Sequence, residues 1–105
     1  MLVCVALLEL RIEFAESLKD KRMVVRSLKD KLRTRFEMSV AEVAMHDVHT
    51  VARLGLTFIA LNDAAAESKL TKIQEFVESN TDAVVTGWTS EKLDFDDAIA
   101  FGELQ

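Results

Sequence analysis

Hydrophobic and polar residues alternate in four stretches of this chain, and each is short enough to form one β-strand. The stretches are residues 2–14, 39–47, 54–62 and 82–89. Side chains of a strand point alternately to its two faces, so this pattern predicts strands with one buried face. The first stretch begins with an apolar run over residues 2–8, which is typical of a strand in the middle of a sheet.

Two other stretches carry apolar residues at the steps of three, four and seven that place side chains on one face of a helix. The first helix is expected to begin at Ser17, with Asp20 three residues on in a capping-box position. Its apolar face consists of Leu18, Val25, Leu28, Leu32 and Phe36. The second helix is expected to begin at Asn62 or Asp63 and to end near Asn80, which can adopt the left-handed conformation. Its apolar face consists of Ala66, Leu70, Ile73 and Val77.

The order strand, helix, strand, strand, helix, strand predicts an α+β fold of the ferredoxin-like βαββαβ type. Both crossovers have the length of a helix, so we expect a four-stranded antiparallel sheet with two helices on one face. The chain has 105 residues, no proline and three glycines, which indicates one domain without linkers. We assign residues 1–90 to this domain and residues 91–105 to an acidic-hydrophobic C-terminal tail.

The second face of the predicted sheet has no helix to cover it, and the residues assigned to it are mostly apolar. They are Val3, Val5, Leu7, Val40, Ala44, Ile59 and Leu61. An exposed apolar face of this extent is typical of a partner surface. We therefore expect a homodimer through this face, or the tail folded over it. A slip of one residue in one strand would change the set.

Basic residues are concentrated in the first predicted helix, although the chain has a net charge of −5. Residues 17–36 contain eight basic and two acidic side chains, a local charge of +6, which leaves −11 for the rest. One stripe along the helix consists of Lys19, Arg22, Arg26, Lys29 and Arg33. Lys21 falls on the apolar side instead, so its ammonium either reaches solvent at the helix end or has a specific partner.

This basic stripe favours an anionic partner. Together with Ser17 and Lys21 at the helix start, it is a candidate site for structured RNA or another polyanion, bound through its backbone. A solvated helix paired with acids of this chain, or with the acidic tail of a neighbour, is the alternative. The segment has no Trp or Tyr, which argues against stacking of single-stranded bases. The second hypothesis for the function is a homodimeric interaction module that uses the open face and the tail.

The sequence offers few candidates for catalysis or metal binding, and they are His46, Asp47 and His49, with Glu42 and Arg53 nearby. The two histidines lack the spacing of ligands on a helix, so a polar loop in which Glu42 or Asp47 pairs with Arg53 is the simpler interpretation. The sole cysteine, Cys4, falls on the inward face of a strand and is expected to act as a small hydrophobe. We expect no enzymatic activity, no metal and no cofactor.

The single cysteine excludes an internal disulfide and indicates a reducing compartment. The apolar run at residues 2–8 follows no basic segment, is too short to span a bilayer and continues as a strand. These features predict a cytoplasmic protein that does not bind membranes.

Several short runs of residues resemble a known family. Residues 17–22, Ser-Leu-Lys-Asp-Lys-Arg after a long first strand, are similar to the signature of the YlxP-like family of small bacterial proteins. The other similar runs are Val-Ala-Glu-Val at 40–43, His-Asp at 46–47, Leu-Gly at 54–55 and Asn-Asp at 62–63. The resemblance spans residues 1–90 and implies a ferredoxin-like fold and a bacterial cytosolic protein. Since genes of this family often lie near those of translation and ribosome-maturation factors, it also implies a ribosome-linked RNA role, and it implies no particular activity.

Overall fold

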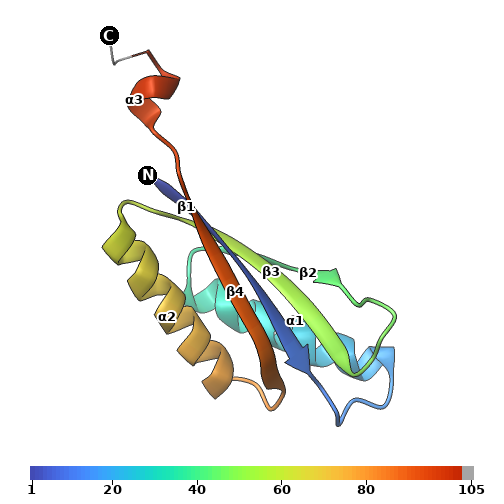
Figure 1. Ribbon diagram of the computed structural model, residues 1–105. Coiled ribbons are helices and arrows are strands. Elements are labelled where there is room, and N and C mark those ends of the chain that lie inside the picture. The colour runs from blue at the N-terminus through green and yellow to red at the C-terminus, as the bar shows by residue number, and fades with distance from the viewer. Residues whose placement is uncertain (103–105) are drawn as a thin grey trace.

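The computed structural model describes residues 1–102. Along the chain it contains β1 (Leu2–Arg11), α1 (Leu18–Arg35), β2 (Ser39–Ala44), β3 (Val51–Ala60), α2 (Asp63–Ser79), β4 (Val84–Asp94) and the short α3 (Asp97–Ala100). The strands form one antiparallel sheet in the order β2-β3-β1-β4, and α1 and α2 cover the same face of it (Figure 1). This confirms the predicted ferredoxin-like α+β fold.

The core lies between the sheet and the two long helices. The central strands β1 and β3 meet in a register that pairs Leu8 with Leu54 and Cys4 with Phe58, and all four side chains are buried. The predicted inward face of α2 is also buried: Ala66, Leu70, Ile73 and Val77. Each fully buried aliphatic side chain stabilises the fold by about 1.5–3 kcal/mol, so this layer carries most of the stability.

Both helices begin at predicted N-caps. The Asp20 backbone N–H donates to Ser17 Oγ at 3.1 Å, and the Ala65 N–H donates to Asn62 Oδ1 at 2.9 Å. Asp20 Oδ2 in turn accepts from the Glu16 N–H at 3.0 Å, so two free donors at the start of α1 are satisfied by neighbouring side chains. The sequence pattern at these two helix starts is therefore confirmed.

The end of α2 differs from the prediction. Asn80 has φ −121° and is not left-handed. Its side-chain Nδ2 donates to the Phe76 carbonyl at 2.9 Å instead, which satisfies one of the free carbonyls at the helix end.

The last strand is longer than the predicted range 82–89. β4 pairs with the whole of β1, with Asp94 opposite Leu2, and the Phe95 N–H donates to the Met1 carbonyl at 2.8 Å. Residues 90–94 continue the strand because the first residues of β1 would otherwise lack hydrogen-bond partners on that side. The predicted boundary between the domain (residues 1–90) and the tail (residues 91–105) consequently falls inside β4.

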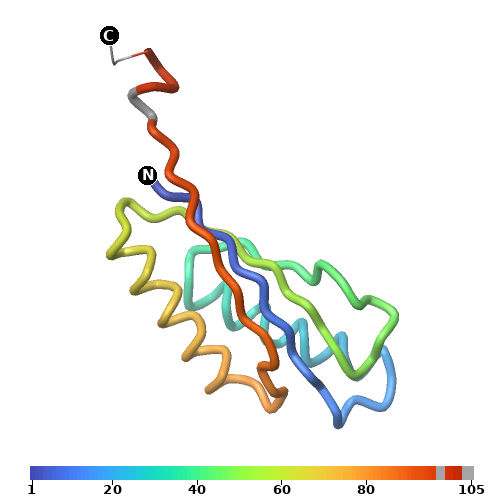
Figure 2. The backbone as a smooth tube through the Cα atoms, viewed as in Figure 1, coloured from blue at the N-terminus to red at the C-terminus, as the bar shows by residue number. Residues whose placement is uncertain are grey.

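Residues 95–102, here called the C-terminal arm, leave the sheet at the end where β1 begins (Figure 2). The arm continues away from the body of the domain and includes α3, and the principal extents are 60 × 25 × 22 Å. The alternative in which the tail folds over its own open face is therefore wrong for the described residues. Residues 103–105 of the predicted tail lie outside the described part.

The open face of the sheet, on the side away from α1 and α2, contains part of the predicted set. Val3 and Ile59 are direct cross-strand partners and lie on this face, as do Val5 and Leu7 by alternation along β1. Val40 does not: it is 4% exposed and pairs with Leu56, whose side chain is buried against the helices. The assignment of Val40 was wrong by one residue because β2 is apolar on both of its faces.

The ends of the other strands correct the set further. A register shift between Glu42 and Ala44 inserts Val43 as a bulge, so Ala44 comes opposite Arg53 on the open face, as predicted, and is half-buried there. Leu61 is one residue beyond the end of β3. The structure adds Val43, Val84 and Leu93. The exposed apolar residues of the open face are thus Val5, Leu7, Val43, Ile59, Val84 and Leu93, together with the half-buried Val3 and Ala44.

Candidate nucleic-acid interface

The outer face of α1 carries four basic side chains without partners. Lys19, Arg22 and Arg26 are exposed, and Lys29 is half-buried. Within residues 1–102 none of the four has a hydrogen-bond or ion-pair partner. At 3.6 residues per turn they lie within about 80° of the helix circumference, so they face the same direction. We call these four residues the basic row.

Arg33, predicted as the fifth member, is partly engaged within the fold. Its Nη2 donates to the Val40 carbonyl at 2.7 Å, and its Nη1 lies 3.9 Å from Asp30 Oδ1. The guanidinium therefore connects the end of α1 to β2. Because the side chain remains 47% exposed, it can still face a ligand at the end of the row.

Acidic residues elsewhere do find partners. On α2, Asp63 and Glu67 both accept hydrogen bonds from Lys92 of β4, at 2.7 Å for Asp63 Oδ1. The hydrogen bond to Asp63, and then that to Glu67, raises the pKa of Lys92 above its ordinary value, so the lysine stays charged at neutral pH. Two acids of α2, Asp63 and Glu67, thus pair with Lys92 of β4 rather than with the basic row.

Lys21 does not belong to any exposed surface. It is 1% exposed, and its Nζ donates to the carbonyls of Met45 at 2.7 Å and Val51 at 3.0 Å. The same Nζ lies 3.0 Å from Glu42 Oε2. The ammonium therefore ties α1 to both ends of the β2–β3 connection, and its assignment to an anion-binding site was wrong. The other option predicted for Lys21, a specific partner for its ammonium within the fold, is confirmed.

Ser17 has a structural role as well, because its hydroxyl oxygen is the N-cap acceptor of α1. Of the six residues that form the run Ser-Leu-Lys-Asp-Lys-Arg, only Lys19 and Arg22 point basic side chains to solvent. Ser17 and Asp20 cap the helix, Lys21 anchors the loop, and Leu18 is half-buried.

The loop with the two histidines forms no catalytic arrangement in the described residues. His46 Nε2 lies 3.2 Å from the Glu42 carbonyl oxygen, while Asp47 and His49 are exposed. The predicted pairing of Arg53 with Glu42 or Asp47 was wrong: Arg53 Nε lies 3.7 Å from Glu9 Oε1 on the open face. No group of three or more potential metal ligands occurs within residues 1–102.

Cys4 lies fully buried in the core, as predicted. Burial raises the pKa of its thiol above the ordinary value, so the thiolate, which is the reactive form, is scarce at neutral pH. We expect Ellman's reagent to leave native Cys4 unmodified over an hour and to modify it within minutes in denaturant. Rapid modification of the native protein would contradict the burial of β1.

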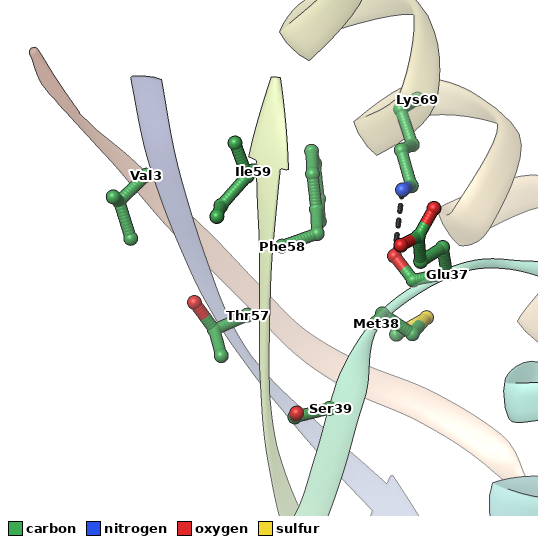
Figure 3. A pocket seen from close by; sticks show the side chains of 8 residues that line it. All are labelled: Val3, Glu37, Met38, Ser39, Thr57, Phe58, Ile59 and Lys69. Carbon is green, nitrogen blue, oxygen red and sulfur yellow. Dashed lines mark hydrogen bonds between the residues drawn. The ribbon is translucent and has the colours of Figure 1, made fainter. Parts of the chain in front are cut away.

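A shallow hollow of about 670 Å³ lies where β3 extends past the start of β2 (Figure 3). Lys69 of α2 reaches into it, donates to the Glu37 carbonyl at 2.7 Å and places its Nζ 4.6 Å from the centre of the Phe58 ring. The remaining lining is mostly apolar: Val3, Met38, Ser39, Thr57 and Ile59. The lysine is thus already bound to the protein through the Glu37 carbonyl, and Glu37 is the only acidic residue in the lining.

The fold and the exposed side chains define a small ferredoxin-like domain with an unpaired basic helix face. Over residues 3–89 the chain matches the family described as "Protein of unknown function (DUF503)", and it belongs to that family. Among curated proteins no match to the chain was found. The family match ends inside β4, so the C-terminal arm lies beyond it. In the described part of the chain, no helix is both long and apolar enough to cross a membrane.

Proposed function

We propose that the protein is a non-enzymatic module that binds structured RNA through the basic row, with Arg33 at its end. The observation that carries the proposal is the lack of partners, among the described residues, for four neighbouring cations on a chain of net charge −5. A merely solvated helix in such a protein is expected to mix charges and pair them. The row instead leaves its full charge available to an anion.

The row suits a backbone rather than individual bases. Together with Arg33 at its end, the row extends fourteen residues from Lys19, or about 21 Å at 1.5 Å per residue, which is long enough to follow several phosphates. Lysine and arginine contacts to phosphate supply affinity without sequence selectivity. No aromatic side chain lies on the row, so stacking on unpaired bases does not contribute. The resemblance to the YlxP-like family supports ribosomal RNA as the ligand.

Salt dependence is the first test. If the four residues of the row each neutralise one phosphate, affinity for a fluorescent fragment of ribosomal RNA should fall about 100-fold between 50 and 200 mM salt. Fluorescence anisotropy measures both affinities. Absence of binding even at the lower salt concentration would contradict the proposal.

A matched pair of charge reversals separates the row from the net charge. Arg26→Glu should weaken RNA binding roughly tenfold because it removes one phosphate contact and introduces repulsion. Lys72→Glu, at an exposed position on α2, makes the same change in net charge and should alter affinity less than twofold. Equal losses in the two variants would show that only the overall charge matters and would refute a site on α1.

A further inference from the structure

The open face of the sheet is an apolar surface that no helix covers among the described residues. Ile59 is 61% exposed and Leu93 64%, and Val5, Leu7 and Val43 are also exposed. Soluble monomers rarely leave a continuous apolar patch larger than a few hundred Å² in water. Three strands about 33 Å long and the shorter β2 of about 20 Å, spaced about 4.8 Å apart, give roughly 600 Å² of flat surface.

This area alone falls short of a stable interface. Standard protein interfaces bury about 800 Å² on each partner. The C-terminal arm supplies additional apolar surface, since Phe95, Ile99 and Phe101 are all exposed. Face and arm together reach the area that a stable dimer requires.

The first residue of the arm, Phe95, still pairs with Met1, while the side chains of Phe95, Ile99 and Phe101 remain exposed. The arm lengthens the molecule, so that the radius of gyration is 15.9 Å, against about 13 Å for a compact chain of this length. The four-residue helix α3 is too short to be stable in water by itself. An extended apolar segment of this kind is expected to pack on a surface outside its own chain.

Charges on the open face select the orientation of a second copy. Arg11 and Arg53 lie at the end of the face opposite the arm, where Glu9 pairs with Arg53 and one positive charge remains, while Glu91 lies on β4 in the half nearer the arm. A two-fold arrangement with antiparallel strands brings the basic end of each copy to the acidic end of its partner. The parallel arrangement would place Arg11 and Arg53 against themselves.

We propose that the open face is the interface of a two-fold symmetric homodimer in which the C-terminal arm of each copy packs on the basic end of the partner's open face. The two sheets then lie face to face, with α1 and α2 of each copy outside. The basic row stays accessible on both outer surfaces. Dimer formation and RNA binding are therefore separate properties that fail or succeed independently.

The test is a dilution series of the full-length protein by light scattering and sedimentation. The wild type should have about twice the monomer mass of 11.8 kDa at micromolar concentration. The Val5→Glu/Ile59→Glu variant places two carboxylates in the centre of the face and should weaken the dimer at least 100-fold. The Ile99→Asp/Phe101→Asp variant tests the arm and should weaken it tenfold or more.

Met23→Glu is the matched control, because Met23 is an equally exposed apolar residue on α1. It should leave the dimer unchanged, and circular dichroism should show that all variants are folded. A wild-type monomer at 100 µM would overturn the proposal. A dimer that survives the face variant would do the same, and a dimer unaffected by the arm variant would refute the role of the arm.

Discussion

Replacing Lys21 with methionine is expected to lower the free energy of unfolding by about 3–4 kcal/mol, a large part of the 5–15 kcal/mol typical of a domain. The methylene stem of Lys21 is retained in shape, but its ammonium is lost. The Glu42 carboxylate, on a side chain that is 16% exposed, then has no counter-charge, and the carbonyls of Met45 and Val51 lose their donor. Urea denaturation followed by circular dichroism measures the change.

The backbone near this contact adds to the loss of stability expected for Lys21→Met. Met45 has φ +64°, a left-handed conformation that is unfavourable for a residue with a side chain. Its carbonyl accepts the shorter of the two hydrogen bonds from Lys21, so the ammonium helps to hold this conformation. Loss of the ammonium should therefore loosen the β2–β3 connection before the rest of the sheet.

Two further variants test the cause. Lys19→Met removes an exposed, unpaired lysine two residues earlier and should change stability by less than about 0.5 kcal/mol. Lys21→Met/Glu42→Leu removes both charges and should recover part of the loss, since the buried carboxylate is gone. A loss below about 1 kcal/mol for Lys21→Met would show that the ammonium is not buried as described.

The second large effect is expected at two neighbouring positions of β2. Val40→Asp should destabilise the domain by about 3–5 kcal/mol or prevent folding, because it buries an unpaired carboxylate between the sheet and the helices. Ala41→Asp places the same group on the open side, opposite Gly55, and should cost less than about 1 kcal/mol. Thermal and urea unfolding at low protein concentration compare the two.

Val40→Ala keeps the test informative if Val40→Asp does not fold. It should cost about 2 kcal/mol through lost burial and a small cavity. A reversed order, with Ala41→Asp the more damaging variant, would mean that β2 faces the core with its other side. The residues assigned to the open face, and with them the proposed dimer interface, would then have to be revised.

The internal contacts of α1 separate folding from binding within the run at residues 17–22. Ser17 and Asp20 cap α1, and Lys21 anchors the loop, so substitutions at these positions test folding. Lys19 and Arg22 have no partners among the described residues and test RNA binding. A binding defect in a Lys21 variant would report unfolding rather than a lost contact.

Local patterns in the sequence were sufficient for the fold. Alternation and helical spacing identified all four strands and both long helices, and the caps at Ser17 and Asn62 were recognisable because capping depends on residues adjacent in the chain. The basic row could be predicted for the same reason, since one helix positions all of its members. The ends of the strands were predicted less accurately. β4 extends beyond its predicted end because β1 offers it hydrogen-bond partners there.

Contacts between distant segments decided what local patterns left open. Helical spacing placed Lys21 on the apolar side of α1, but only the approach of residues 42–51 shows that the ammonium is bound there and is unavailable to RNA. Alternation could not orient β2, which is apolar on both faces, so pairing with β3 placed Val40 inside. Local sequence was enough to predict the strands, the long helices and the basic row, because these depend on neighbouring residues. Tertiary structure decided which lysine is buried, which side of β2 faces the core and where the arm leaves the sheet, because these depend on pairings across the chain.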